Sequence, residues 1–139
     1  MVKTVKPIYI CFLFIFFVVL DVLANIYDWF WIFGWFDVLM HFLGGALAGA
    51  AFFWIFPRFF ITFNRSFTQF FIIFTLAMGF VALVGVVWEF HELVFDIQGS
   101  VADTMEDLFN DFAGGAVAAL IIFFRQKKSF IASQPSTDA

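Results

Sequence analysis

The chain has 139 residues, of which 64% are hydrophobic and only 13% are charged, and its mean hydropathy is +1.01. Soluble domains contain about 45–50% apolar residues, so this composition is typical of a membrane protein. The formal net charge of −4 says little about nucleic acid, but the seven basic residues lie at membrane edges and do not form a nucleic-acid footprint. The single cysteine, Cys11, excludes an intramolecular disulfide and a cysteine-based zinc cluster.

Four apolar segments predict an all-α fold, a polytopic membrane protein built as a four-transmembrane-helix bundle. The predicted helices span residues 8–24, 36–56, 67–95 and 103–124. A transmembrane span needs about 20 residues, so the first helix is short and the third must tilt or protrude. We expect a single transmembrane domain over residues 1–128 and a disordered, polar cytoplasmic tail over 129–139.

The basic residues predict the orientation of these helices. They are Lys3, Lys6, Arg58, Arg65, Arg125, Lys127 and Lys128. With four spans they all fall on one side of the membrane, and segments 25–36 and 96–102 on the other side contain no Lys or Arg. By the positive-inside rule both termini are therefore cytoplasmic. The segment 26–36, rich in Trp and Tyr, has the composition of an outer interfacial belt.

The first apolar run has a second interpretation, as a cleaved signal peptide. Lysines precede the run, and Val22-Leu23-Ala24 is similar to a cleavage site. Asp21, near the end of the run, argues against cleavage. The sequence leaves open whether residues 1–24 are removed.

Acidic residues and one histidine occur inside or beside the apolar helices, where ionisable groups are costly and indicate functional sites. The candidate site residues are Asp21, Asp37, His41, Glu89, Glu92, Asp103, Asp107 and Asp111. The predicted topology places all of them near the outer ends of their helices. Spacings of three or four residues put those on one helix on a single face, so we expect each helix to contribute a polar stripe to a shared interior.

Crowded carboxylates repel one another in a low-dielectric interior, so either some are protonated or a cation neutralises them. Carboxylate-rich four-helix sites with histidine are similar to di-metal bundles. Oxygen ligands with one imidazole permit Mg, Mn, Ca, Fe or Zn, and the sequence does not choose among them. We expect the cluster to bind a divalent metal cation.

Plainer roles are open for several of these residues. Asp37 and Asp103 are also suited to cap the helices that they begin, and Glu106 would complete a D-x-x-E capping box with Asp103. His91 lies across its helix from Glu89 and is expected at the interface. A purely structural hydrogen-bond network between helices would also explain the cluster.

Small residues on the last three helices predict close packing between their backbones. They are Gly44, Gly45, Ala48, Gly49, Gly79, Ala82, Gly85, Gly114, Gly115 and Ala119. Packing is a sufficient explanation for all of them.

Three motifs follow one another along the last three helices. They are F-D-x-x-x-H-F-x-G-G at 36–45, G-x-x-W-E-x-x-E at 85–92 and D-T-x-x-D-L-x-x-D-x-x-G-G at 103–115. Together they resemble the YjdF-type bacterial inner-membrane proteins and, more distantly, the VanZ-like membrane proteins. The resemblance implies a small multi-pass protein of the bacterial cytoplasmic (inner) membrane and supplies no reaction. The chain lacks the Gln and Arg usual in VanZ-like proteins before the last helix, so glycopeptide resistance is not carried over.

Three classes of function stay open. The first is binding of a divalent cation at an outward-facing acidic and histidine site. The second is a membrane enzyme that acts on a lipid or cell-envelope substrate through metal-activated water. The third is a cation or proton conduit or a purely structural protein, although the apolar cytoplasmic half disfavours a conduit. The expected partners are the lipid bilayer and a lipid or cell-envelope ligand, with no nucleic acid.

Overall fold

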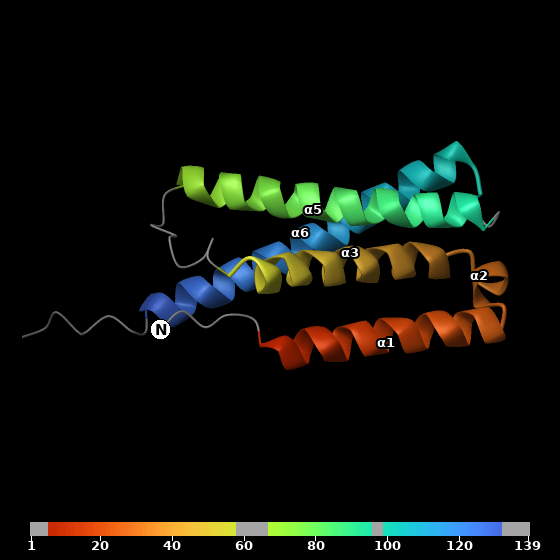
Figure 1. Cartoon of the computed structure of the whole chain (residues 1–139), viewed down its shortest axis with the longest axis horizontal. Coiled ribbons are helices and arrows are strands. Elements are labelled where there is room, and N and C mark those ends of the chain that lie inside the picture. The colour runs from red at the N-terminus through yellow and green to blue at the C-terminus, as the bar shows by residue number, and fades with distance from the viewer. Residues whose placement is uncertain (1–5, 58–66, 96–98, 132–139) are drawn as a thin grey trace, which may run out of the picture.

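The computed structural model describes residues 6–57, 67–95 and 99–131, and every regular element within these ranges is a helix. The helices are α1 (Pro7–Ile26), α2 (Trp29–Ile32), α3 (Phe36–Ile55), α5 (Phe67–Val94) and α6 (Val101–Ile131). Helices α1, α3 and α5 run along the long axis of the molecule, and α6 crosses them obliquely (Figure 1). Among the described residues, 4 helices are long and apolar enough to cross a membrane. The predicted all-α membrane fold is confirmed.

The observed helix ends depart most from the predicted ones in the last helix. Helix α6 begins at Val101 and continues to Ile131, so it includes residues 129–131 of the tail that we expected to be disordered. The rest of that tail lies outside the described residues. The outer belt contains the short helix α2, which the chain enters through Asp28 in a left-handed conformation (φ 56°) that aspartate tolerates. Trp31 in α2 is 88% exposed, as expected for an interfacial aromatic residue.

Each of the helices α3, α5 and α6 has a buried stripe with a residue every four positions, so its members lie on one helix face. On α3 the stripe is His41, Gly45, Gly49 and Phe53. On α6 it is Asp107, Asp111, Gly115 and Ala119, and on α5 it is Glu89, Gly85, Val81 and Ala77. Along every stripe the side chains change from ionisable at one end, through glycine, to apolar at the other.

Glycines bring α3 and α6 into backbone contact. A Cβ atom on Gly45 would meet the backbone of Asp111, and one on Gly114 would meet the carbonyl of Phe42. Gly45 and Gly49 form a small-xxx-small pair, which lets membrane helices approach closely. This contact fixes the register of the two helices, because neither can slide without driving side chains into the partner backbone.

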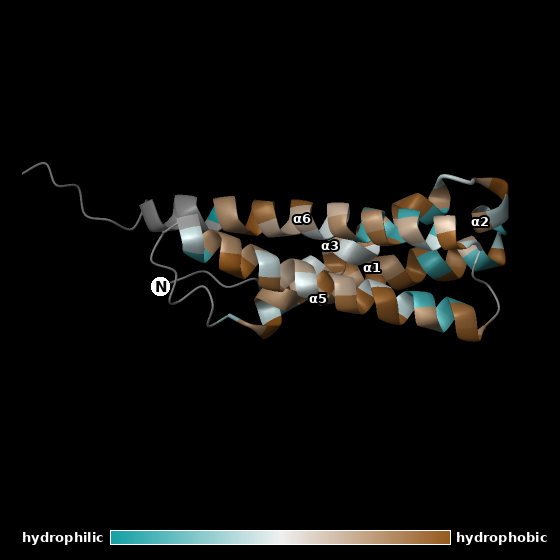
Figure 2. Cartoon of the chain, turned by 90° about the horizontal axis from the view of Figure 1, so that it is seen from above, coloured by the Kyte–Doolittle hydropathy of each residue, from teal (hydrophilic) through white to brown (hydrophobic). Residues whose placement is uncertain are grey.

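The apolar ends of the stripes form a core of Phe52, Phe53, Ala77 and Ala119. The ionisable ends lie at the end of the bundle where α2 joins α1 to α3, and hydrophilic residues gather there (Figure 2). We call this the acidic end. Helix α1 packs mainly on α3 and leaves most of its surface exposed, as expected for a helix that faces lipid.

Candidate metal centre at the acidic end

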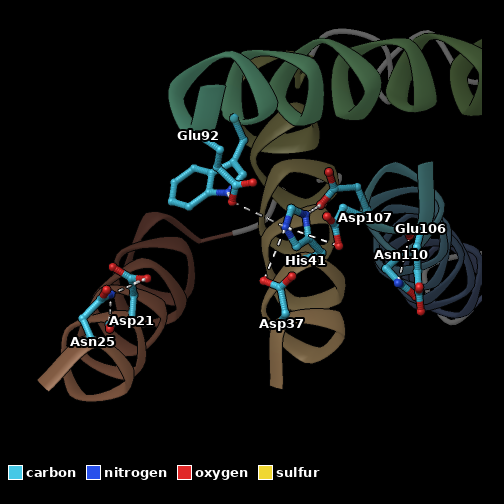
Figure 3. A network of polar contacts seen from close by, with 10 residues as sticks. Asp21, Asn25, Asp37, His41, Glu92, Glu106, Asp107 and Asn110 are labelled. Carbon is cyan, nitrogen blue, oxygen red and sulfur yellow. Dashed lines mark hydrogen bonds and ion pairs between the residues drawn. The ribbon is translucent and has the colours of Figure 1, made fainter. Parts of the chain in front are cut away.

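His41 lies among carboxylates from α3, α5 and α6 at the acidic end. Figure 3 shows Asp37, Glu92 and Asp107 directed toward its imidazole. We call the whole group the acidic-histidine cluster. Its members are His41, Asp37, Glu89, Glu92, Asp103, Asp107 and Asp111. His41, Glu89, Asp107 and Asp111 are buried although all four are ionisable.

Helix α3 contributes Asp37 and His41 from successive turns. The helix starts after Trp35, and no side chain caps it. The capping role expected for Asp37 is therefore wrong: the residue lies inside the first turn. Its Oδ1 atom is 3.8 Å from His41 Nε2, since residues four apart share a helix face.

Helix α6 is capped by Ser100 instead of Asp103. The backbone N–H of Asp103 donates to Ser100 Oγ at 3.2 Å, and the helix begins at Val101. The expected capping role of Asp103 and its box with Glu106 are therefore wrong, and the Asp103 carboxylate is directed to the cluster. Glu106 is exposed and lies on the far side of α6 from His41 (Figure 3).

The two imidazole nitrogens of His41 face different carboxylates. Nδ1 lies 3.5 Å from Asp111 Oδ1, whereas Nε2 lies 3.6 Å from Asp107 Oδ1 and 4.0 Å from Glu92 Oε1. A proton on Nδ1 directed at Asp111 would leave the Nε2 lone pair facing the other carboxylates. Metal-binding histidines are commonly oriented in this way by a carboxylate behind them. Asp111 thus supports the histidine from the side away from Asp107.

Trp88 positions Glu92 on α5. The indole Nε1–H donates to Glu92 Oε1 at 2.8 Å, one turn along the helix. The ring also contacts Phe17 of α1 edge-on, with 6.4 Å between centroids. This role of Trp88 was not predicted from the sequence, although its spacing of four residues from Glu92 was a usable signal.

Two groups of ligand atoms within the cluster are compact enough to hold a metal ion. The first contains one atom each from His41, Glu89, Glu92 and Asp107, and the second one each from Asp37, Asp103 and Asp107. Within each group all atoms lie within 4.8 Å of one another. Carboxylates with one imidazole form a donor set that suits Mn²⁺, Fe²⁺ or Zn²⁺, and an all-carboxylate set suits Mg²⁺, Ca²⁺ or Mn²⁺.

Two carboxylate oxygens at the centre of the cluster are unsatisfied. Oδ2 of Asp107 and Oδ2 of Asp111 are buried and have no hydrogen-bond partner. A buried polar atom in this state costs about 1–3 kcal/mol, and a charged one costs more. The basic side chains that the structure describes are Lys6 and Arg125. Lys6 precedes α1 and Arg125 lies in the last part of α6, both at the end of the bundle away from the cluster. Among the described residues, the site therefore has excess acceptors and no Lys or Arg side chain to match them.

Glycines make room for the Asp111 carboxylate. A Cβ atom on Gly85 of α5 would meet Asp111 Oδ2, and one on Gly44 of α3 would lie 3.9 Å from Asp111 Oδ1. From the sequence, helix packing alone was expected of these glycines. The structure adds that they leave space for a functional side chain between the helices.

Asp21 is the one predicted site residue that the structure does not bring into the cluster. It lies on α1 beside Asn25, whose side-chain amide donates to the Asp21 carbonyl at 2.9 Å and to Oδ1 at 3.4 Å. Figure 3 shows this pair separate from His41. The hydrogen-bond partner of Asp21 is therefore on its own helix. His91, which we expect at the membrane interface, is exposed and stacks on Trp88 with 5.2 Å between ring centroids.

Comparison with known proteins gives one result. A family model described as "Predicted membrane protein (DUF2238)" matches residues 3–128. No curated protein and no solved structure matches the chain. The family description agrees with the spanning helices and names neither a reaction nor a ligand.

Proposed function

We propose that this chain, which belongs to the DUF2238 family of predicted membrane proteins, binds a divalent metal cation at the acidic-histidine cluster. The observation that supports this most is the first ligand group, whose four atoms come from α3, α5 and α6 and lie within 4.8 Å of one another. Its members His41, Glu89 and Asp107 are buried, so the ligands are held by packing before a cation arrives. Preorganised ligands reduce the entropic cost of binding.

The unsatisfied oxygens favour a cation over a purely structural network. A hydrogen-bonded network that only joined helices would pair its buried acceptors, as buried polar groups generally are paired. Asp107 Oδ2 and Asp111 Oδ2 are buried without such partners. A divalent cation supplies the missing positive charge without a further side chain.

A conduit through the bundle is disfavoured by the apolar half. Beyond the glycines, the interior is filled by Phe52, Phe53, Ala77 and Ala119. An ion pathway needs polar groups along its length, because charge is costly in an apolar interior. The cluster is therefore better explained as a binding site at one end of the bundle than as part of a pathway through it.

A membrane enzyme acting on a lipid or cell-envelope substrate is the second function that an observation favours. The Asp37 side chain is 35% exposed, whereas that of His41 is 4% exposed. The cluster is thus open on the Asp37 side, where lipid headgroups and water would reach it at a membrane surface. A cation there could activate water for hydrolysis. Metal-dependent release of headgroups from defined lipid vesicles would support this function over binding alone.

The cluster faces the outside of the bacterial inner membrane in this proposal, with both termini in the cytoplasm. The positive-inside rule supports this orientation, and the resemblance to YjdF-type proteins supports the bacterial inner membrane. Single cysteines at positions 100 and 129, in a Cys11→Ser background, test it in intact cells. A membrane-impermeant thiol reagent should label position 100 and not 129. Labelling of both positions from one side contradicts the orientation.

Metal binding is tested directly with purified, chelator-treated protein. Mn²⁺ or Zn²⁺ should bind stoichiometrically and raise the unfolding temperature. Asp107→Asn and His41→Ala should each weaken binding at least about tenfold. Glu106→Gln is the matched control, because Glu106 adjoins Asp107 on α6 and is exposed; it should bind as the wild type does. The proposal fails if Mg²⁺, Mn²⁺, Ca²⁺, Fe²⁺ and Zn²⁺ all neither bind nor shift the unfolding temperature.

Acid should release the metal. Carboxylate and imidazole ligands must lose their protons to bind a cation, so protons compete with it. The Mn²⁺ affinity of the wild type should fall as the pH is lowered, and isothermal titration at several pH values measures this. An affinity that is independent of pH would exclude these ligands.

A further inference from the structure

Asp107 is the only residue shared by the two ligand groups of the described chain. The first group adds His41, Glu89 and Glu92 to it, and the second adds Asp37 and Asp103. The two groups therefore meet at a single carboxylate. The first group includes a nitrogen ligand, whereas the second has oxygen ligands alone.

The two oxygens of Asp107 have different surroundings. Oδ1 lies 3.6 Å from His41 Nε2, on the side of the first group. Oδ2 is buried and has no hydrogen-bond partner. The residue is only 2% exposed, so water does not satisfy that oxygen from bulk solvent. A carboxylate can bind a separate cation through each oxygen, and Asp107 has one oxygen directed to the first group and one still unsatisfied.

The second group contains Asp103, whose carboxylate is not needed as a helix cap. Ser100 caps α6, so the Asp103 carboxylate does not act as the N-cap. Asp103 also lies against Gly99: a Cβ atom on Gly99 would meet the Oδ2 atom of Asp103. Asp37 and Asp103 are both half-buried, which leaves their side of Asp107 more open than the side of His41.

Charge balance also favours more than one cation. The carboxylates of the cluster surround one imidazole, and one divalent cation at the first group would leave Asp37 and Asp103 without a counter-charge. Ligand oxygens of Asp37 and Asp103 lie within 4.8 Å of each other, and like charges this close destabilise one another when partly buried. A second cation beside Asp37, Asp103 and Asp107 would offset them.

We infer that the acidic-histidine cluster is a two-cation site in which Asp107 bridges the ions. One cation is bound by His41, Glu89, Glu92 and Asp107, and the other by Asp37, Asp103 and Asp107. This inference rests on the proposed function and extends it. The second cation has only carboxylate ligands and a more exposed position, so it exchanges faster and keeps coordination positions for water or for an oxygen ligand from outside.

The test is a titration of the metal-stripped full-length protein in lipid nanodiscs with Mn²⁺ alone and with Zn²⁺ alone. The bound metal per chain is counted after removal of free ions, and electron paramagnetic resonance of the Mn²⁺ form reports the distance between ions. We expect two ions per chain for either metal. The Mn²⁺ spectrum should show exchange coupling, because carboxylate-bridged ions lie about 3.5–4 Å apart.

The double variant Asp37→Asn, Asp103→Asn isolates the second position without changing side-chain size. It should bind one Mn²⁺ per chain and lose the exchange coupling, whereas Glu106→Gln should keep both. Gly99→Ala, which crowds the Asp103 carboxylate, should weaken the second ion and leave the first unchanged.

The outcomes separate the two proposals. One uncoupled ion in the wild type, unaffected by the double variant, overturns the two-cation site and leaves the proposed function standing. Two ions without exchange coupling overturn the bridging role of Asp107. No bound Mn²⁺ or Zn²⁺ in the wild type overturns the two-cation site. The proposed function is refuted as well only when Mg²⁺, Ca²⁺ and Fe²⁺ also fail to bind.

Discussion

The acidic end and the apolar end of the bundle are built on the same three buried stripes. They differ in whether the buried groups have the contacts that they need. At the apolar end, Phe53, Ala77 and Ala119 pack in a closed core. At the acidic end, the same stripes carry ionisable residues, and the Oδ2 atoms of Asp107 and Asp111 lack hydrogen-bond partners. The comparison indicates a division of labour, because binding sites commonly contain groups that would lower the stability of an ordinary core.

The glycine layer between the two ends couples them. Gly45 and Gly114 set the contact between α3 and α6, and Gly85 leaves space for the Asp111 carboxylate. A change in this layer should affect both ends, whereas a change at either end should affect mainly that end.

Gly45→Leu should have the largest effect on the molecule. A side chain at this position would strike the backbone of Asp111, so α3 and α6 must separate. We expect a loss of at least about 3 kcal/mol in unfolding free energy, together with loss of metal binding. Chemical unfolding in detergent micelles measures the first quantity. Gly79→Leu is the control: a Cβ atom there meets nothing within 4 Å, so this variant should remain folded and bind metal.

Phe52→Ala should lower stability and spare the site. Phe52 is 3% exposed in the apolar core. Phe→Ala costs about 3–5 kcal/mol in soluble cores, and less is expected here because lipid is as apolar as the core, so we expect about 1–3 kcal/mol. Phe90→Ala, at a position that is 61% exposed, is the matched control. An equal loss of metal affinity and stability in Phe52→Ala would contradict the division between the two ends.

Asp111→Asn should raise the stability of the metal-free protein and lower its response to metal. The substitution removes a buried negative charge, and we expect a gain of about 1 kcal/mol in unfolding free energy without metal. The rise in unfolding temperature on adding Mn²⁺ should shrink, since His41 loses the carboxylate behind Nδ1. If metal-free Asp111→Asn is less stable than the metal-free wild type, Asp111 supports the fold without a cation.

Gly85→Ala should have the smallest effect on stability and a clear effect on binding. The added methyl group would meet Asp111 Oδ2, which is the end of a side chain and can move aside. We expect a stability change within about 1 kcal/mol and a loss of Mn²⁺ affinity of about tenfold, the usual effect of disturbing an outer-shell partner. Isothermal titration and thermal unfolding separate the two quantities. Unchanged affinity would exclude a positioning role for Asp111.

The number and approximate bounds of the spanning helices were determined by the sequence alone. Apolar runs of this length have few alternatives, because a membrane requires every backbone group to be bonded within its helix. The positions of His41, Glu89, Asp107 and Asp111 on buried stripes were also predictable, since residues four apart share a helix face.

Only the tertiary structure decided which polar residues meet. Asp21 has the same kind of stripe as the others, and its spacing of four from Asn25 allows the pairing within α1. That spacing does not show that Asp21 stays out of the cluster. Asp103 had the sequence of a helix cap, and Ser100 takes that position in the folded chain. Spacing along a helix fixes only the face on which a side chain lies. The distance between faces depends on how closely the helices approach, and that is set here by the glycine contacts of α3, α5 and α6.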